Sequence, residues 1–356
     1  MTLTIQQSLR TTIHCMKADY LTPVSIFKRL QGRHKFLLES SSKYEESGRY
    51  SFIGANPRKT YFGEQTTLYD FTHDTKQQYT YNGSVLDSLK QVMPRVSSVT
   101  DFPFIGGAVG YIRYGAGTEL AQPEQMPEVQ FHIYDTLIIF DHIKDEVTIV
   151  YTNIAAEHQQ SDIETVLTQL GKVENPEPLS FEIGELQHTT NCAQASFAGD
   201  AFELYRKLRI QLPGAYMYYM EFEGHTIIGS SKDSFVAVTN GQVQAHFNEE
   251  TYQNATVEAI QKVAHNVKTH ETVTGNLQQG LHSLDVLKTL LPPIHVQDFN
   301  GPRKAYGSVI GYIGFNGQID FTLADQVLVI EQETIFVTAE HTKFTELTSM
   351  LAQLKG

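Results

Sequence analysis

Cysteine is scarce in this sequence, and long apolar runs are missing from it. The 356 residues include two cysteines, Cys15 and Cys192, whose spacing matches no metal motif and which are too few for a disulfide framework. We therefore expect reduced thiols, as in cytosolic proteins. Residues 1–15 are polar and lack the apolar core of a signal peptide, and no apolar run approaches the roughly 18 residues of a membrane span. These features predict a soluble, cytoplasmic protein.

Basic residues are outnumbered by acidic ones. Lysine and arginine total 27 against 40 aspartates and glutamates, which gives a net charge of −13. Proteins that bind nucleic acid or an anionic membrane surface gather positive charge, so this balance argues against both kinds of partner. A small anionic substrate stays compatible with the sequence, because a local pocket can oppose the field of the whole chain.

The pattern of apolar residues indicates a sheet-rich protein. Hydrophobic residues make up 41% of the chain and charged residues 19%, as in ordinary globular proteins. Alternating and β-branched runs predict many strands, with helices interspersed without strict alternation. We predict an α+β fold of large, mostly antiparallel sheets with outer helices, divided into domains at residues 1–175 and 190–356. The polar segment 154–200 is predicted to be a linker that one helix, at 162–171, interrupts.

Local signals predict where some elements begin and end. Thr22 is a good helix cap, and Pro23 suits the first helical position. Residues 136–141 and 146–151 should form a hairpin, because two β-branched runs flank a short polar turn. Residues 253–271 are predicted to form one long, mostly polar helix.

The pattern Gly-x-x-x-Gly-Tyr-Ile occurs twice, at residues 106–112 and 307–313. Glycine inside a strand marks the close approach of another backbone or a ligand. Two copies are too few for a repeat architecture. We predict instead that these two segments are similar strands lying side by side.

Several segments carry a further signal through their order along the chain. They are residues 37–40 (Leu-Leu-Glu-Ser), 49–54 (Arg-Tyr-Ser-Phe-Ile-Gly), 104–111, 135–142, 204–217, 228–231 and 311–321. Together they resemble the large subunit, component I, of anthranilate synthase, a family of chorismate-utilising enzymes. The resemblance extends over nearly the whole chain.

The resemblance implies a fold, a reaction and a regulatory site. Family members bind chorismate and Mg²⁺ and, with ammonia delivered by a glutamine amidotransferase subunit, make anthranilate and pyruvate. This lyase reaction belongs to tryptophan biosynthesis, and tryptophan bound between the sheets inhibits many members. Carried over by the motifs, the tryptophan-binding residues are Leu38, Glu39, Ser40, Pro213, Tyr216 and Met217, and the catalytic residue is Tyr312.

The Glu39 carboxylate and the Ser40 hydroxyl would hold the ammonium group of the amino acid. Pro213, Tyr216 and Met217 would supply the flat apolar wall that an indole ring prefers.

Most of the catalytic motifs that the resemblance implies are missing. The family holds Mg²⁺ with glutamates on two helices, whereas Thr342 and Thr345 align with such positions here and Ser349 aligns with a lysine. Gln326 aligns with the arginine that binds a substrate carboxylate, and glutamine cannot replace a charged, bidentate guanidinium. Segments that the family would have next in order are missing at several places, for example after Phe247, which indicates internal deletions. We predict impaired catalysis and no metal ligands in this chain.

Three functions stay open at this point. The chain is a divergent but active enzyme, a non-catalytic protein that binds tryptophan or the amidotransferase subunit, or a decayed product that folds poorly. Aminodeoxychorismate and isochorismate synthases are related alternatives. The Leu-Leu-Glu-Ser segment favours the tryptophan pathway.

Overall fold

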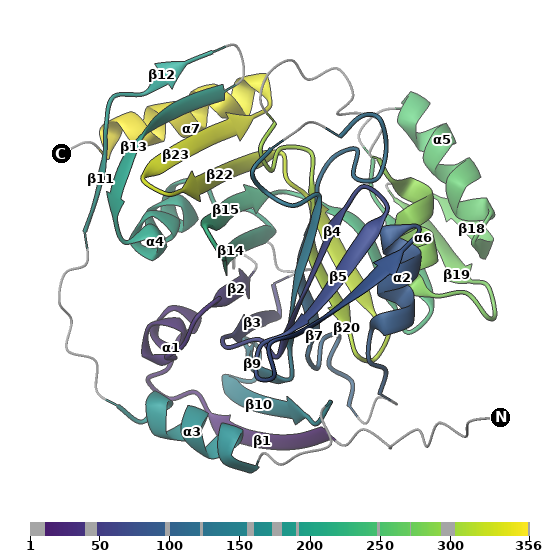
Figure 1. Ribbon diagram of the computed structural model, residues 1–356, viewed down its shortest axis with the longest axis horizontal. Helices are drawn as coiled ribbons and strands as arrows, with labels where there is room; N and C mark the ends of the chain where they lie inside the picture. Colours follow the sequence, from purple (N-terminus) through teal and green to yellow (C-terminus); the bar gives the residue numbers. More distant parts are fainter. Residues whose placement is uncertain are drawn as a thin grey trace.

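The computed structural model describes residues 11–39, 48–96, 100–121, 124–154, 160–172, 180–189, 192–247, 250–270, 272–292 and 303–354. Within these residues the chain forms two large antiparallel sheets that lie face to face, with helices on their outer sides (Figure 1). The predicted α+β fold with mostly antiparallel sheets and outer helices is confirmed. No helix among the described residues is long and apolar enough to cross a membrane.

The first sheet, sheet A, has twelve described strands. In spatial order they are β1 (Thr11–Lys17), β10 (Glu146–Thr152), β9 (Thr136–Asp141), β3 (Tyr50–Gly54), β2 (Phe36–Glu39), β14 (Tyr216–Phe222), β15 (His225–Ser231), β22 (Gln326–Glu331), β23 (Thr334–Ala339), β13 (Cys192–Gly199) and β11 (Phe181–Ile183), with β12 (Gln187–His188) also paired to β13.

The second sheet, sheet B, has eleven described strands. In spatial order they are β18 (Ala264–Thr269), β19 (Val273–Leu277), β17 (Gln242–Ala245), β16 (Ser234–Thr239), β21 (Ile319–Leu323), β20 (Val309–Gly314), β7 (Gly107–Ile112), β8 (Val129–Tyr134), β4 (Lys59–Glu64), β5 (Thr67–Thr72) and β6 (Gln77–Asn82).

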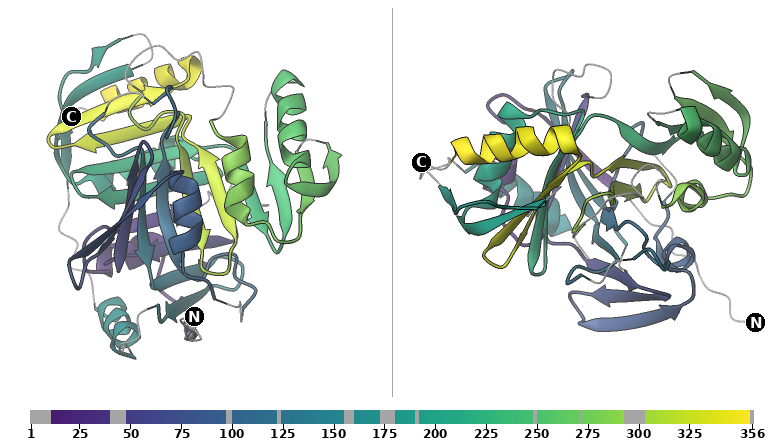
Figure 2. Two further views of the ribbon diagram at one scale, coloured as in Figure 1. Left: turned by 45° about the vertical axis from the view of Figure 1, so that its right-hand side comes forward. Right: turned by 90° about the horizontal axis from the view of Figure 1, so that it is seen from above.

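Helices cover the outer face of each sheet. Those on sheet A are α1 (Pro23–Arg29), α3 (Gln160–Leu170), α4 (Ala201–Gln211) and α7 (His341–Gln353), and those on sheet B are α2 (Val85–Val92), α5 (Glu250–Gln261) and α6 (Ser283–Leu290). Figure 2 shows yellow α7 across the outer side of sheet A. A third apolar cluster fills the space between the sheets, where Phe36 and Tyr218 of sheet A meet Val109 and Ile310 of sheet B.

Both halves of the sequence contribute strands to both sheets. In sheet A, β2 of the first half pairs with β14 of the second half, and in sheet B, β7 pairs with β20. The predicted boundary between residues 175 and 190 therefore separates two sequence halves that share both sheets. That it divides two domains stays a prediction.

The predicted start of the first helix agrees with the structure. The Thr22 hydroxyl accepts a hydrogen bond from the Ser25 backbone N–H at 3.1 Å, and the Ser25 hydroxyl accepts one from the Thr22 N–H at 2.8 Å. This reciprocal cap satisfies two of the backbone groups that a helix start leaves unpaired. Pro23 follows as the first residue of α1.

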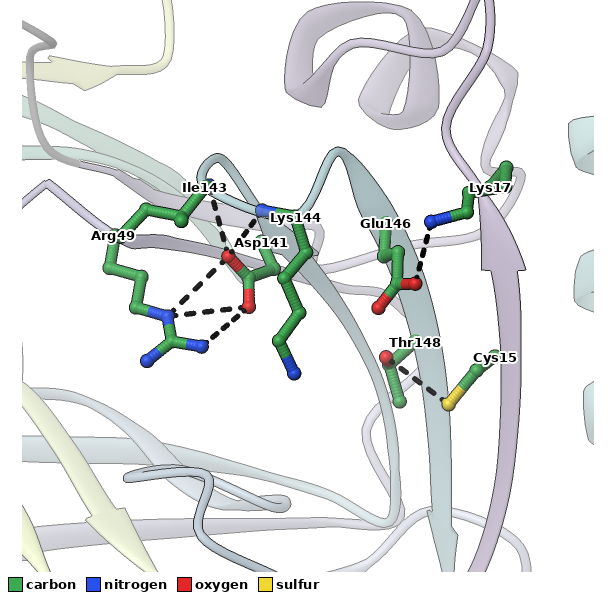
Figure 3. A network of polar contacts seen from close by, with 8 residues as sticks. All are labelled: Cys15, Lys17, Arg49, Asp141, Ile143, Lys144, Glu146 and Thr148. Carbon is green, nitrogen blue, oxygen red and sulfur yellow. Dashed lines mark hydrogen bonds and ion pairs between the residues drawn. The ribbon is translucent and has the colours of Figure 1, made fainter.

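The predicted hairpin at residues 136–151 is also present, as β9 and β10 (Figure 3). Asp141, the last residue of β9, accepts hydrogen bonds from the backbone N–H groups of Ile143 (3.0 Å) and Lys144 (3.1 Å). The Arg49 guanidinium pairs with the same carboxylate at 3.0 Å. One buried aspartate thus fixes the turn and also ties it to the segment that leads into β3.

The two glycine-rich segments are neighbours, as predicted. They form β7 and β20, which pair antiparallel with Gly110 opposite Gly311. A Cβ atom at Gly110 would lie 1.9 Å from the Gln130 carbonyl oxygen, and one at Gly311 would lie 2.0 Å from that of Asp320. Glycine is needed here because the adjacent strands approach too closely for a side chain.

Two predicted elements were wrong. The helix expected at residues 253–271 ends at Gln261, and Ala264–Thr269 is instead strand β18, paired with β19. The segment expected to be a linker contains β11, β12 and β13, and β13 pairs with β23 inside sheet A. Strand β13 is determined by pairing with the distant β23 and β18 by its hairpin with β19, and local polarity reveals neither pairing.

Candidate ligand cavity between the sheets

A small cavity of about 80 Å³ lies between the two sheets, and we call it the inter-sheet cavity. Sheet A contributes residues of β2, β3 and β14 to its walls, and sheet B contributes residues of β20 and β21. Its lining includes Leu38, Phe52, Tyr216, Tyr312 and Asp320.

Aromatic rings form one wall of the inter-sheet cavity. The ring of Tyr312 stacks on Phe104 with centroids 4.3 Å apart and meets the edge of Phe52 at 5.8 Å. Burial raises the pKa of the Tyr312 phenol well above its usual range. Tyr312 therefore stays protonated at neutral pH and presents a neutral hydroxyl.

Asp320 gives the cavity a polar end. Its carboxylate accepts hydrogen bonds from the Tyr216 hydroxyl at 3.0 Å and the Ser234 hydroxyl at 3.4 Å. The carboxylate is buried away from solvent, and this burial raises the pKa of Asp320 to about 7. No lysine, arginine or histidine of the described chain forms an ion pair with it. A ligand that brings a positive charge would therefore stabilise the ionised carboxylate.

The predicted tryptophan-binding residues do not all face this cavity. Leu38, Glu39, Tyr216 and Met217 are among the residues that line it, although the Met217 side chain packs in the apolar cluster on the helix side of sheet A. Met217 is paired with Glu39 across the β2–β14 ladder, so their side chains share a face. Pro213 lies between α4 and β14 and is not among the residues of the cavity wall, and Ser40 lies outside the described residues.

Glu39 is already fully engaged on the outer face. Its carboxylate accepts hydrogen bonds from the Tyr205 hydroxyl (2.6 Å) and from Nε of Arg209 (2.5 Å), both on α4, and its side chain is 1% exposed. The Glu39 carboxylate thus has its donors within the protein, whereas Asp320 at the inner face has two neutral hydroxyl donors.

The helix positions expected to hold the metal lie on the other side of sheet A. Thr342 and Thr345, which align with metal-binding glutamates, and Ser349, which aligns with a lysine, are exposed on α7, and α7 packs through Phe344 and Leu347 on the outer face of the sheet. Neutral hydroxyls are poor substitutes for the carboxylates that Mg²⁺ prefers, so these residues do not fit the metal. Among the described residues, no group of three or more histidines, cysteines, aspartates or glutamates is arranged to hold a metal ion.

Gln326, which aligns with the substrate-binding arginine, is the first residue of β22 and is buried. Its side-chain nitrogen has no hydrogen-bond partner within the described structure. An amide in this position offers no positive charge to a carboxylate substrate.

Comparison with known proteins shows what this chain is similar to. A profile of the chorismate binding enzymes matches residues 182–247. Anthranilate synthase component 1 of Lactococcus lactis is 24% identical, with 91% of this chain and 92% of that protein aligned. The same protein of Bacillus subtilis is also 24% identical, over 92% of this chain and 86% of the relative.

Two solved structures share the fold. Anthranilate synthase component I of Streptococcus pneumoniae superposes with a TM-score of 0.67 at 21% identity, covering 96% of this chain and 99% of the other. The menaquinone-specific isochorismate synthase of Escherichia coli gives a TM-score of 0.63 at 11% identity, over 98% and 94% of the two chains.

The alignment also shows how many positions have no counterpart in this chain. It spans 426 positions with the Lactococcus lactis protein, yet 91% of this 356-residue chain is about 324 residues. About 100 aligned positions therefore have no residue here. Along most of its length and in its fold, this chain is similar to component 1 of anthranilate synthase, with about 100 positions of the alignment unfilled.

Proposed function

We propose that this chain is a relative of anthranilate synthase component 1 that no longer converts chorismate. The proposal is supported by the side chains at the aligned catalytic positions. Thr342 and Thr345 replace expected metal-binding carboxylates on an exposed helix face, and a neutral Gln326 replaces an arginine. Chorismate is a dicarboxylate whose elimination requires that its charge and the metal both be held.

The retained activity in this proposal is binding of an amino acid with an aromatic side chain, tryptophan in the first place, in the inter-sheet cavity. The observation that carries it is Asp320, a buried carboxylate with two hydroxyl donors and no cation beside it in the described structure. The ammonium of the ligand would pair with Asp320, and its ring would lie among Tyr312, Phe52 and Leu38.

The size of the cavity sets a condition on this binding. Its volume of about 80 Å³ is below the roughly 300–1,000 Å³ of typical small-molecule sites. An amino acid as large as tryptophan therefore enters only when the lining side chains move outward. The cost of that movement lowers the affinity, since binding must supply it.

The test is a pair of measurements on the purified chain. Incubation with chorismate, ammonium and Mg²⁺, followed by chromatography, should yield no anthranilate. The same chromatogram resolves aminodeoxychorismate and isochorismate, so it also tests the related alternatives. Formation of any of these products at an enzymatic rate would contradict the loss of catalysis.

The binding half of the proposal is tested by thermal shift, because a ligand of the native state raises its stability. L-tryptophan should raise the melting temperature of the wild type but not that of Asp320→Asn. Asp233→Asn, at an exposed neighbouring position, is the matched control and should respond like the wild type. An equal response of Asp320→Asn would remove Asp320 from the site.

A glutamine amidotransferase subunit remains a proposed partner, because component 1 is one part of a two-component enzyme by name. Co-purification of this chain with the amidotransferase subunit of anthranilate synthase from the same organism would test it. Loss of turnover does not by itself remove a docking surface.

A further inference from the structure

A second cavity, much larger than the first, opens where the chain crosses between the sheets. Its volume is about 630 Å³, within the range of small-molecule sites. Its walls come from the connection between β3 and β4, the connection between β8 and β9, the β5–β6 turn, the end of α1 and one face of α3. We call it the crossing cavity, defined by Leu30, Arg33, Arg58, His73, Lys76 and Val166.

The fixed charges of the crossing cavity leave an excess of positive charge. Arg58 is held by two carboxylates, with Nε 2.6 Å from Asp135 and Nη1 2.5 Å from Asp74. Arg33 and Lys76 also line the cavity, and within the described chain neither forms an ion pair. Among the lining residues three cations thus face two anions, in a protein whose net charge is −13, and Glu223, 3.7 Å from Nε2 of His34, is 89% exposed and outside the lining. A local positive site on an acidic chain concentrates anions.

Two histidines add donors without adding charge. The rings of His34 and His73 lie 5.9 Å apart in the cavity wall, and burial lowers the pKa of both. They are therefore neutral at pH 7, where each imidazole carries one N–H. The backbone of His34 is in the left-handed region (φ 53°) and is held there by the Tyr134 hydroxyl, which donates to its carbonyl oxygen at 2.5 Å.

The opposite wall is apolar. It is formed by Leu30 of the α1 end, Val166 of α3 and the strand residues Ile53 and Ile138, all of which are less than a tenth exposed. Phe71 adds a ring beside His73, with centroids 5.2 Å apart. A ligand that fits both walls has an apolar ring and an anionic head.

We infer that the crossing cavity binds a small aromatic monocarboxylate, with the carboxylate between Arg33 and Lys76 and the ring against Leu30, Val166 and Phe71. The planar fork of an arginine suits a carboxylate, which it can bind through two hydrogen bonds. One excess positive charge matches one carboxylate and leaves a phosphate dianion uncompensated. The site differs from the inter-sheet cavity, whose polar end is a carboxylate and selects a cation.

Three naphthalene compounds with one ring body and different heads test the inference by isothermal titration calorimetry. They are 2-naphthoate, the neutral 2-naphthamide and 2-naphthyl phosphate. The wild type should bind 2-naphthoate, and both other compounds should bind about tenfold more weakly or not at all, because a charge-assisted hydrogen bond contributes about that factor.

Variants identify the cavity that is responsible. Arg33→Gln should weaken 2-naphthoate binding about tenfold or more, and Lys76→Gln should weaken it by a smaller factor. Lys262→Gln removes the same charge from an exposed position after α5, and Asp320→Asn alters the inter-sheet cavity, so both should bind 2-naphthoate like the wild type. Binding that is unchanged in Arg33→Gln, or equal for the amide, would overturn the inference. Tighter binding of the phosphate would overturn the preference for a carboxylate.

Discussion

At the scale of single residues, the two buried carboxylates near β2 and β21 have opposite surroundings. Glu39 has a guanidinium and a phenol hydroxyl as donors and lies on the helix side of sheet A. Asp320 has two neutral hydroxyls and no cation within the described residues, on the inner side of sheet B. The first carboxylate therefore stabilises the fold, whereas the second is available to a ligand.

The surroundings of Glu39 lead to a stability prediction. Glu39→Gln should lower the free energy of unfolding by about 2 kcal/mol, because the charge-assisted bonds to Arg209 and Tyr205 are weakened at a buried site. Urea denaturation measures the change. Glu146→Gln is the control, since Glu146 pairs with the exposed Lys17 (Figure 3) and surface pairs contribute little. Equal effects of the two substitutions would contradict the assigned role of Glu39.

The raised pKa of Asp320 leads to a pH prediction. Its folded pKa of about 7 exceeds the ordinary value of 3.8, so between these pH values the folded chain holds a proton that the unfolded chain has lost. Stability should therefore fall as the pH rises from 4 to 7, by up to about 4 kcal/mol from this group. Asp320→Asn should be more stable than the wild type at pH 8, and the difference should vanish near pH 4. A constant difference across this range would show that Asp320 does not titrate as described.

At the scale of elements, strands β7 and β20 depend on close approach of their neighbours. Gly311→Ala should destabilise the chain by about 3 kcal/mol, because its Cβ would lie 2.0 Å from the Asp320 carbonyl oxygen and the backbones must separate. Gly171→Ala is the control, since its Cβ would meet no atom closer than 3.5 Å. Chemical denaturation of both variants checks the prediction, which fails if Gly311→Ala unfolds at the same urea concentration as the control.

Local sequence predicted elements whose signals are local. The Thr22-Pro23 cap, the β9–β10 hairpin and the twin glycine strands were all predictable, because caps, turns and glycine patterns act over a few residues. Strands β13 and β18 were not, since their pairing partners β23 and β19 determine them and the polar residues on their exposed faces resemble a linker or a helix.

The candidate site was only partly predictable for the same reason. Tyr312 and Asp320 both lie within motifs of the sequence, but the motifs alone do not show that the two residues pair across the β20–β21 hairpin. That pairing follows from the Asn316-Gly317 turn between two alternating runs and would have identified Asp320. The face occupied by Glu39 could not be predicted, because it depends on the register of β2 against β14.

At the scale of the whole molecule, the two sequence halves complete each other's sheets. Without the second half, β2 loses β14 and β7 loses β20, and both would become open edges in the middle of a core.

We therefore expect residues 1–175 and 176–356, expressed separately, to lack stable tertiary structure. Co-expression should restore a complex with the hydrogen-exchange protection of the intact chain. Hydrogen exchange followed by mass spectrometry provides the measurement. A first half that is protected on its own would instead support two independently folding domains.

The inter-sheet cavity is lined by residues of both seams, the two strand pairs β2–β14 and β7–β20 through which the sequence halves join. Leu38 belongs to the β2–β14 seam, and Gly311 and Tyr312 belong to the β7–β20 seam. A ligand bound there would contact both strand pairs at once, so its binding should stabilise the association of the two sequence halves in both sheets. The strands that line this cavity are present in the shortened chain. Ligand binding there should therefore make the two sheets more rigid even in the absence of catalysis.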